Sequence, residues 1–383
     1  MEESMESNDL LELLTDILAI DTQNPPGNEK NLAEFICAYL QGLPCHVQVQ
    51  DLGMNRGNVI AIRKGKTAGN ALLLNGHLDT VPYGDRESWN TPPETPTLKD
   101  GRIYARGASD MKSGLCAALY AFKRFCESGQ VPEHDVIFAG TADEETGGLG
   151  AQALLDAGCL KEVTHIVIGE PTGNALGLCA KGTLWLRCAV QGRTSHAAYP
   201  QQGISAIQYA FMLAQAAAQC VEGHSHPLLG EATCTLTQIE GGVKVNMLPD
   251  ACVITLDIRT TPDLPHAELL AAIRARASAL MASAPGLDIA IEVFGDRMPI
   301  SAPEDCLIAQ KLEESYQHIK NEKIPYVGTA FFSDASIFLK TLKADAVLFG
   351  PGDSEEAHRP NESVSIEAVK QAAHVYEELL QRG

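Results

Sequence analysis

The sequence predicts an α/β fold in which a mostly parallel sheet is flanked by helices and a smaller two-layer α/β domain interrupts it. Helical and strand patterns alternate up to about residue 178, as in proteins built around a parallel sheet. From residue 179 the pattern changes to alternating strands and Ala-rich helices, and from residue 294 the first pattern returns. We therefore expect residues 1–178 and 294–383 to form one domain and residues 179–293 an inserted one.

The first part of the chain contains clear helical and strand patterns. Leucines and isoleucines recur at helical spacing over residues 9–19, after Ser7 and Asn8, which can cap a helix. The run Leu72–Leu74 is typical of a strand that is covered on both faces, and Gly76 ends it. Further helices are expected at 28–41, 115–125, 151–157 and from 366, and further strands at 58–62, 135–139, 166–168 and 346–349.

The inserted region has its own periodicity. Polar and apolar residues alternate over 184–190, 233–239 and 251–258, which indicates half-buried strands. Helical patterns cover about 204–221 and 267–281. Two strand–helix–strand repeats of this kind predict a small ferredoxin-like domain with an antiparallel sheet.

Composition limits the partners of the protein. The 383 residues include 45% hydrophobic and 20% charged residues, as expected for a globular protein of two or three domains. A net charge of −20 and a pI near 4.9 argue against nucleic acid or an anionic membrane as a partner. No apolar run approaches the roughly 18–20 residues that span a bilayer, and the acidic N-terminus is unlike a signal peptide. We expect a cytoplasmic protein.

The cysteine pattern also favours a cytoplasmic protein. Eleven are scattered singly, with no Cys-x-x-Cys pair. This pattern is typical of reduced thiols in a cytosol and argues against a zinc site built from thiolates.

Acidic and imidazole side chains follow the predicted strands repeatedly. His77 and Asp79 follow the strand at 72–74, and single acidic segments follow three others. A solvated acidic loop or a surface histidine explains each segment alone, but not their repetition at strand ends, where α/β proteins bind ligands. Imidazole and carboxylate ligands suit Zn²⁺, Co²⁺ or Mn²⁺ in a hydrolytic site. The candidate side chains are those of His77, Asp110, Glu144, Glu145, Glu170 and His358.

Six motifs together resemble a known family, the M20 metallopeptidases and deacylases, which include acetylornithine deacetylase and succinyl-diaminopimelate desuccinylase. The resemblance covers nearly the whole chain. Its motifs are Gly76-His-Leu-Asp-Thr-Val-Pro82, Gly107-Ala-Ser-Asp-Met-Lys-Ser-Gly114, Asp143-Glu-Glu-Thr-Gly147, Gly169-Glu-Pro-Thr172, Ser195-His-Ala-Ala198 and Ala357-His-Arg-Pro-Asn-Glu362.

The resemblance implies a di-metal aminopeptidase-like catalytic domain holding two divalent ions. We expect Zn²⁺, with Co²⁺ and Mn²⁺ as alternatives. His77 and Glu170 would bind one ion, Glu145 and His358 the other, and Asp110 would bridge them. Asp79 would accept the second N–H of the His77 imidazole, and Glu144 would be the general base for a water held between the ions.

The resemblance also assigns a role to the inserted region. It would be a lid and dimerisation domain, whose His196 stabilises the oxyanion in the active site of the partner subunit of a homodimer. Asn246 and Arg259 match positions that bind the substrate carboxylate, and Ser333 lies in a turn near the substrate. A surface ion pair is the alternative for Arg259. The apolar residues before Ser333 depart from the turn of the deacylases.

The expected reaction is hydrolysis of the amide bond of an N-acyl amino acid, such as N-acetylornithine or N-succinyl-diaminopimelate. Gly169-Glu170 favours a deacylase over a dipeptidase or a glutamate-carboxypeptidase-like enzyme, which stays the alternative. Ser109-Asp-Met-Lys112 matches the Ser-x-x-Lys of serine β-lactamases, but the accompanying motifs are absent from the sequence. A binding protein that has lost catalysis would be expected to lack Glu144 or a ligand, and none is missing.

Overall fold

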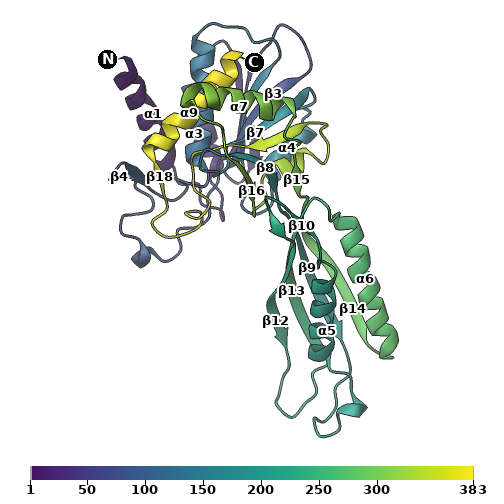
Figure 1. The fold of residues 1–383 in the computed structure, drawn as a ribbon. Helices are drawn as coiled ribbons and strands as arrows, with labels where there is room; N and C mark the ends of the chain where they lie inside the picture. Colours follow the sequence, from purple (N-terminus) through teal and green to yellow (C-terminus); the bar gives the residue numbers. More distant parts are fainter. Residues whose placement is uncertain (1, 383) are drawn as a thin grey trace. The chain divides into compact units, whose positions relative to one another are not determined.

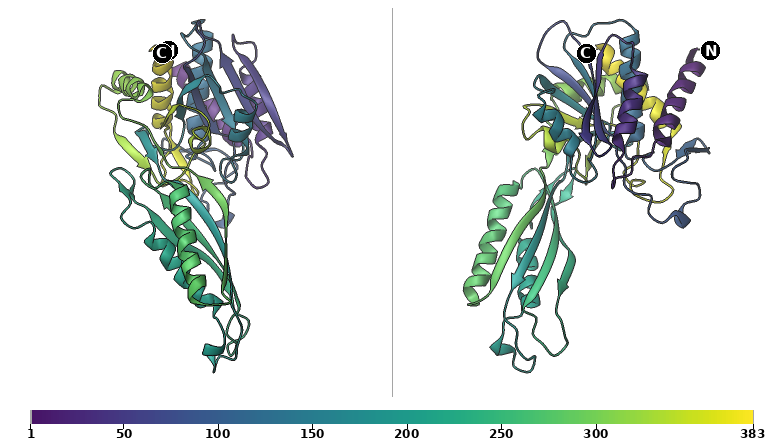
Figure 2. Two further views of the ribbon diagram at one scale, coloured as in Figure 1. Left: turned by 90° about the vertical axis from the view of Figure 1, so that its right-hand side faces the viewer. Right: turned by 180° about the vertical axis from the view of Figure 1, so that it is seen from behind.

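The computed structural model describes residues 2–382 and divides the chain into two compact units. The smaller unit comprises Ala180–Ile300 and Gly328–Phe332, and the larger unit comprises the rest. Figure 1 labels the elements of both units, and Figure 2 shows the same ribbon from two further sides. Residue 293, the expected end of the insertion, lies inside a strand that continues to Arg297, because its pairing with the neighbouring strand continues past a bulge at Val293–Gly295.

The larger unit is built on a sheet of the order β1-β2-β6-β3-β7-β17-β8-β15, with β16 paired to β8. Its strands are β1 (His46–Gly53), β2 (Arg56–Arg63), β3 (Ala71–His77), β6 (Val136–Thr141), β7 (Val163–Ile168), β8 (Leu176–Ala180), β15 (Ile300–Ser301), β16 (Tyr326–Thr329) and β17 (Asp345–Leu348). The α/β class predicted from the sequence is confirmed by this arrangement of strands and helices.

The sheet is mixed rather than mostly parallel. Strands β6, β3, β7 and β17 are parallel to one another, whereas β1–β2, β2–β6 and β17–β8 are antiparallel pairs. The turn between β1 and β2 explains the first of these pairs. Met54 and Asn55 both have positive φ values, of 49° and 61°, as in the tight turns that join antiparallel strands.

Helices cover both faces of this sheet. Helices α1 (Glu2–Ala19), α3 (Lys112–Glu127), α7 (Leu307–Lys320) and α9 (Ile366–Arg382) pack against one another, and α7 contacts β7 and β17. Helix α2 (Glu29–Tyr39) packs on β1 and β2, and α4 (Leu149–Asp156) contacts α8 (Ala335–Phe338). The helix predicted at residues 115–125 is α3. It is buried along most of its length and packs on β3 and β6.

Short elements complete the larger unit. They are η1 (Arg86–Ser88), β4 (Thr97–Lys99), β5 (Arg102–Tyr104) and β18 (Ser363–Ser365), and the three strands form a small sheet of the order β18-β5-β4. None of the helices within residues 2–382 combines the length and hydrophobicity that crossing a lipid bilayer requires.

The smaller unit is a two-layer α/β structure with an antiparallel sheet of the order β12-β13-β9-β14. Its main elements are β9 (Gly182–Gln191), α5 (Ala206–Gln219), β12 (Thr233–Gly241), β13 (Ala251–Thr260), α6 (His266–Ser283) and β14 (Asp288–Arg297), with η2 (Pro200–Gln202), β10 (Ser225–His226) and β11 (Gly230–Glu231) in the connections. Alternate residues of β9 and β13 are buried against the helices. This is the ferredoxin-like order that the repeats predicted.

Candidate metal centre

The candidate site lies at the carboxyl ends of the parallel strands. β3 ends on His77, β6 ends just before Asp143, and β7 ends just before Glu170. The carboxyl ends of parallel strands share one edge of a sheet, where ligands bind in this class of fold. The topology thus brings together side chains that are far apart in the sequence.

Asp110 lies between two imidazoles. Its Oδ1 is 3.2 Å from His77 Nε2, and its Oδ2 is 3.3 Å from His358 Nε2. Each carboxylate oxygen therefore faces a different histidine. His358 has a φ of +63°, a conformation uncommon outside glycine that is often found at functional sites.

Glu145 approaches the same two groups. Its Oε2 is 3.1 Å from His358 Nε2, and one possible ligand atom from each of His77, Asp110 and Glu145 lies within 4.8 Å of the others. Glu170 and Glu144 are buried beside them. Four of the expected ligands are thus linked by direct contacts, namely His77, Asp110, Glu145 and His358. The fifth, Glu170, is a buried carboxyl group close enough to interact electrostatically with them.

Burial and mutual charge shift the pKa of most groups in this cluster. Burial raises the pKa of Glu144 and Glu170 well above the usual value, and Glu145 shifts in the same direction for the same main reason. Contacts with Asp110 and Glu145 raise the pKa of His358 to about 10. Burial opposes protonation of His77, but Asp110 and Glu144 still raise its pKa well above the usual value. A divalent ion would stabilise the buried carboxylates directly.

The donor set fits such an ion. Imidazole nitrogens and carboxylate oxygens without thiolates are the ligands that Zn²⁺, Co²⁺ and Mn²⁺ accept in hydrolytic sites. Glu144 Oε1 is buried and has no hydrogen-bond partner within the described residues, so this carboxylate is available for a further group. We conclude that the residues present can hold a metal.

Asp79 contacts His77 differently from the expectation. The backbone carbonyl of Asp79 lies 2.9 Å from His77 Nδ1, whereas its carboxylate Oδ1 is 3.6 Å away. The carboxylate instead accepts hydrogen bonds from the backbone N–H groups of Glu144 and Glu145, at 3.1 and 3.3 Å. The carbonyl can therefore orient the imidazole, and the carboxylate holds the loop that carries the two glutamates.

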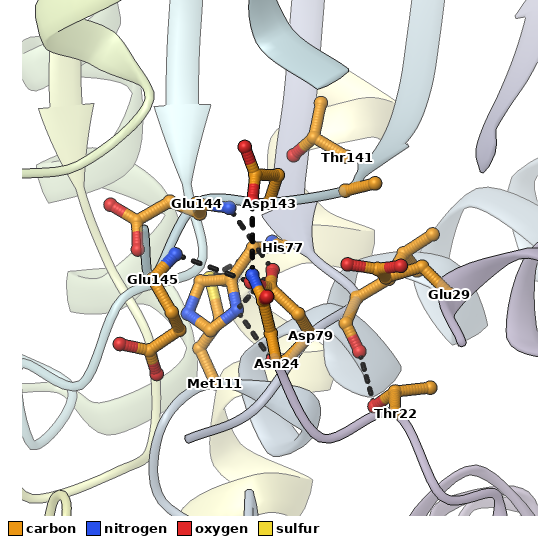
Figure 3. A network of polar contacts seen from close by, with 12 residues as sticks. Thr22, Asn24, Glu29, His77, Asp79, Met111, Thr141, Asp143, Glu144 and Glu145 are labelled. Carbon is orange, nitrogen blue, oxygen red and sulfur yellow. Dashed lines mark hydrogen bonds and ion pairs between the residues drawn. The ribbon is translucent and has the colours of Figure 1, made fainter. Parts of the chain in front are cut away.

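Glu144 and Glu145 lie in a turn that follows β6. Their backbone N–H groups both point at Asp79, and Figure 3 shows their carboxylates lying apart from each other. One carboxylate can therefore face the metal ligands while the other stays unpaired.

Asn24 was missed as a site residue. Its Nδ2 lies 2.8 Å from Asp79 Oδ2 and 3.0 Å from Asp143 Oδ1 (Figure 3). Asp143 also forms an ion pair of 2.8 Å with Arg56. Asn24 begins the segment Asn24-Pro-Pro-Gly27, and no local signal in the sequence ties it to residues more than fifty positions away.

Glu362 holds the loop of Asp110. Its carboxylate accepts hydrogen bonds from the backbone N–H groups of Ser109 at 2.8 Å and Asp110 at 3.0 Å, and it pairs with Arg106 at 2.7 Å. The residue belongs to a motif in the sequence but was given no role there. Both of its carboxylate oxygens are occupied by Arg106 and by backbone N–H groups of this loop, so it supports the candidate metal ligand.

Ser109 and Lys112 do not form a nucleophile and base. Lys112 Nζ donates to the backbone carbonyls of Ile17 and Ile20, whereas Ser109 Oγ donates to the carbonyl of Asp353. Both residues of the Ser-x-x-Lys match therefore stabilise the fold through contacts with backbone carbonyls, and they do not contact each other.

The other expected residues are placed as follows. His196 and Asn246 are exposed in the smaller unit, where His196 and Met247 form an isolated β-bridge. Arg259 Nε donates to Asp257 Oδ1 at 2.8 Å. Its guanidinium thus forms an ion pair, which was the alternative to a role in substrate binding. Ser333 is buried in the larger unit beside Asp334, which accepts a hydrogen bond from Thr141.

Comparison with known proteins identifies the family and agrees with the fold. The sequence profile of Peptidase family M20/M25/M40 matches residues 73–382. An acetylornithine deacetylase of Myxococcus xanthus is 31% identical over 92% of each chain. A probable succinyl-diaminopimelate desuccinylase of Staphylococcus epidermidis is 26% identical over 98% of each chain.

Solved structures share the fold at low sequence identity. The M20 family metallo-carboxypeptidase Sso-CP2 of Sulfolobus solfataricus matches with a TM-score of 0.79 and 18% identity, covering 97% of this chain and 98% of that one. The YXEP protein of Bacillus subtilis, described as a dinuclear metal binding peptidase, matches with a TM-score of 0.71 and 15% identity over 98% of both chains.

A cluster of carboxylates and imidazoles at the carboxyl edge of an α/β sheet defines the class as metal-binding hydrolases. Within that class, the chain belongs to Peptidase family M20/M25/M40.

Proposed function

We propose that this protein hydrolyses the amide bond of an N-acyl amino acid, of the N-acetylornithine or N-succinyl-diaminopimelate type. The observation that carries the proposal is the position of Asp110 between His77 and His358, with Glu145 against His358. The names of the two relatives, which match almost the full length of the chain, support a deacylase.

Two divalent ions fit the donor set. His77 and Glu170 would hold one, Glu145 and His358 the other, and the two oxygens of Asp110 would face one ion each. When bound, such ions polarise the scissile carbonyl and make an attacking water more acidic. Zn²⁺ is the ion we propose, and Co²⁺ or Mn²⁺ would suit the same ligands.

Glu144 would move the proton. Its buried Oε1 lacks a hydrogen-bond partner within the described residues, and burial together with Glu170 raises its pKa, which makes it a stronger base than an exposed carboxylate. In the proposed reaction it would take a proton from the water that attacks the carbonyl carbon. It would then give that proton to the amine nitrogen as the C–N bond breaks, releasing a carboxylic acid and a free amine.

The smaller unit would complete the site in an assembly of two chains. We propose that it is the lid and dimerisation domain, and that His196 donates to the oxyanion in the active site of the partner subunit. Asn246, Arg259 and Ser333 would bind the substrate. Arg259 would have to exchange its contact with Asp257 for the substrate carboxylate.

A substrate panel tests the proposal. The protein with added Zn²⁺ or Co²⁺ is incubated with N-acetylornithine, N-succinyl-diaminopimelate and a dipeptide, and release of free amine is followed. We expect turnover of at least one N-acyl amino acid. Hydrolysis of the dipeptide alone would contradict the deacylase and support the alternative, an M20-type dipeptidase or glutamate-carboxypeptidase-like peptidase.

A further inference from the structure

The larger unit contains a cavity of about 450 Å³ at the other end of its sheet from the candidate metal centre. Leu72, Val136 and His165 line it near the amino ends of β3, β6 and β7, and they are neighbours in the strand register. Leu72 precedes His77 by five residues on β3, which is roughly 16 Å of extended chain. The cavity is therefore separate from the proposed reaction site.

Apolar side chains from two helices form much of its remaining wall. Leu307 and Ile308 come from the first turn of α7, and Leu379 and Leu380 come from the last turns of α9. The volume lies within the range of about 300–1,000 Å³ that small-molecule sites occupy. These walls suit an aliphatic group.

One cation in the wall has no partner among the side chains that the structure describes. Lys311 of α7 lines the cavity, and no side chain or carbonyl of residues 8–382 accepts a hydrogen bond from its ammonium group. His165 Nδ1 is buried and also lacks a hydrogen-bond partner in the described part of the chain. Burial, and then the nearby charge of Lys311, lower the pKa of His165, so its ring is neutral at pH 7. A neutral imidazole can donate one N–H.

The carboxylates around the cavity do not neutralise Lys311. Asp135 pairs with Lys64 at 2.6 Å and Glu133 with Lys66 at 3.6 Å. Asp345, next to His165 in the register of β17, forms no ion pair with Lys311 in the described structure. The side chain of Lys311 is partly buried beside apolar residues, so an anion that brings its own negative charge would stabilise its ammonium group.

We propose that this cavity binds a small aliphatic carboxylic acid, with the carboxylate at Lys311 and His165 and the alkyl chain against the leucines of α7 and α9. One ammonium and one imidazole N–H match a single carboxylate. A phosphate, with more charge and more oxygens to satisfy, would lie close to the carboxylates of Glu133 and Asp135, which also line the cavity and would repel it more strongly than a single carboxylate.

Octanoate is a suitable probe for the full-length protein with its metals bound. Isothermal titration should give saturable binding at one site, whereas octylammonium, with the same tail and the opposite charge, should not bind there. Acetate, which has the same head group and no tail, should bind at least about tenfold more weakly because it buries little apolar surface.

Variants locate the site. Lys311→Gln should weaken octanoate binding about tenfold or more, since it removes a charge-assisted hydrogen bond. Lys320→Gln, at an exposed position of the same helix, is the matched control and should leave binding unchanged. Leu307→Asp places a negative charge at a side chain that is 47% exposed, in a helical turn that tolerates Asp, and should also weaken binding.

The Asp110→Asn variant separates this cavity from the metal centre. Octanoate should still bind to it, because Asp110 lies at the other end of the sheet. Loss of binding in Asp110→Asn would place octanoate at the metal centre and overturn the proposal. Binding that is unchanged in both Lys311→Gln and Leu307→Asp, or the absence of saturable binding, would overturn it equally.

Discussion

Asp110 is the residue on which the proposed metal centre depends most, because its two oxygens face different imidazoles. A terminal ligand such as Glu145 contributes to one ion, whereas a bridging carboxylate contributes to both. Removing one oxygen donor at Asp110 should therefore affect both ions together.

We expect Asp110→Asn to lose most of the bound metal and the hydrolytic activity. The amide keeps the shape of the side chain but removes the negative charge that the two proposed ions would share. Metal content per chain, measured by mass spectrometry after dialysis, checks this. The matched control is Asp100→Asn, in an exposed turn where Asn is well tolerated. Retention of full metal content in Asp110→Asn would contradict the bridging role.

Glu144→Gln should separate metal binding from proton transfer. The amide cannot accept the proton, so turnover should fall by about 10²–10⁴-fold while metal content stays the same. Glu355→Gln, an exposed glutamate in another loop of the same unit, should behave like the wild type. Normal turnover of Glu144→Gln with a saturating substrate would show that another group is the base.

Residue types and motifs predicted the candidate ligands, but the supporting residues were harder to predict. Asn24 reaches Asp143 across 119 positions of sequence, and only the fold brings the two together. Asp79 was recognised, yet its backbone carbonyl rather than its carboxylate lies at hydrogen-bonding distance from His77. Which atom of a residue makes a contact depends on the backbone path, which a motif does not specify.

At the scale of elements, the loop that carries Asp110 depends on a segment from the far end of the chain. Glu362, just before β18, accepts hydrogen bonds from two backbone N–H groups of this loop. β18 in turn pairs with β5, which leads into the loop. The small sheet thus fixes the position of Asp110 relative to the strand ends.

Glu362→Gln should loosen this loop and weaken metal binding by about 10–100-fold, as is usual when a group that supports a ligand is changed. Competition with a chelator measures the apparent affinity for Zn²⁺. Glu367→Gln, exposed in the first turn of α9, is the control. An unchanged Zn²⁺ affinity in Glu362→Gln would show that the loop holds its position without this carboxylate.

Long helices and buried strands were predictable because their periodicity is local. The helix expected at 267–281 is α6 (His266–Ser283), and the strand expected at 135–139 is β6. The direction of β1 and the three short strands of the small sheet were not predicted. Strands of three residues carry too little pattern, and their pairing is decided by contacts distant in the sequence.

At the scale of the whole molecule, the candidate functional residues are divided between the two units. The larger unit contains all the candidate ligands, whereas His196, Asn246 and Arg259 belong to the smaller one. The sequence predicted an insertion because its strand periodicity differs from that of the flanking regions. It could not reveal whether two chains assemble, since that depends on surface complementarity.

His196→Ala should lower turnover and leave metal content unchanged, because the side chain is proposed to stabilise the oxyanion. Mixing His196→Ala with Glu144→Gln under conditions that exchange subunits should restore turnover, since a hybrid assembly has one site with both groups intact. A His196→Ala protein with normal turnover would remove His196 from the mechanism. No recovery on mixing would place its action within its own chain.

Metal dependence is the most direct test of the proposed reaction. Purified protein is stripped with a chelator, and Zn²⁺ is then added back while N-acetylornithine hydrolysis and bound metal are measured together. We expect activity to disappear with the metal and to return as the chain binds two ions, with most of it lost again in Asp110→Asn. Hydrolysis that continues at full rate after complete removal of metal would contradict the di-metal mechanism.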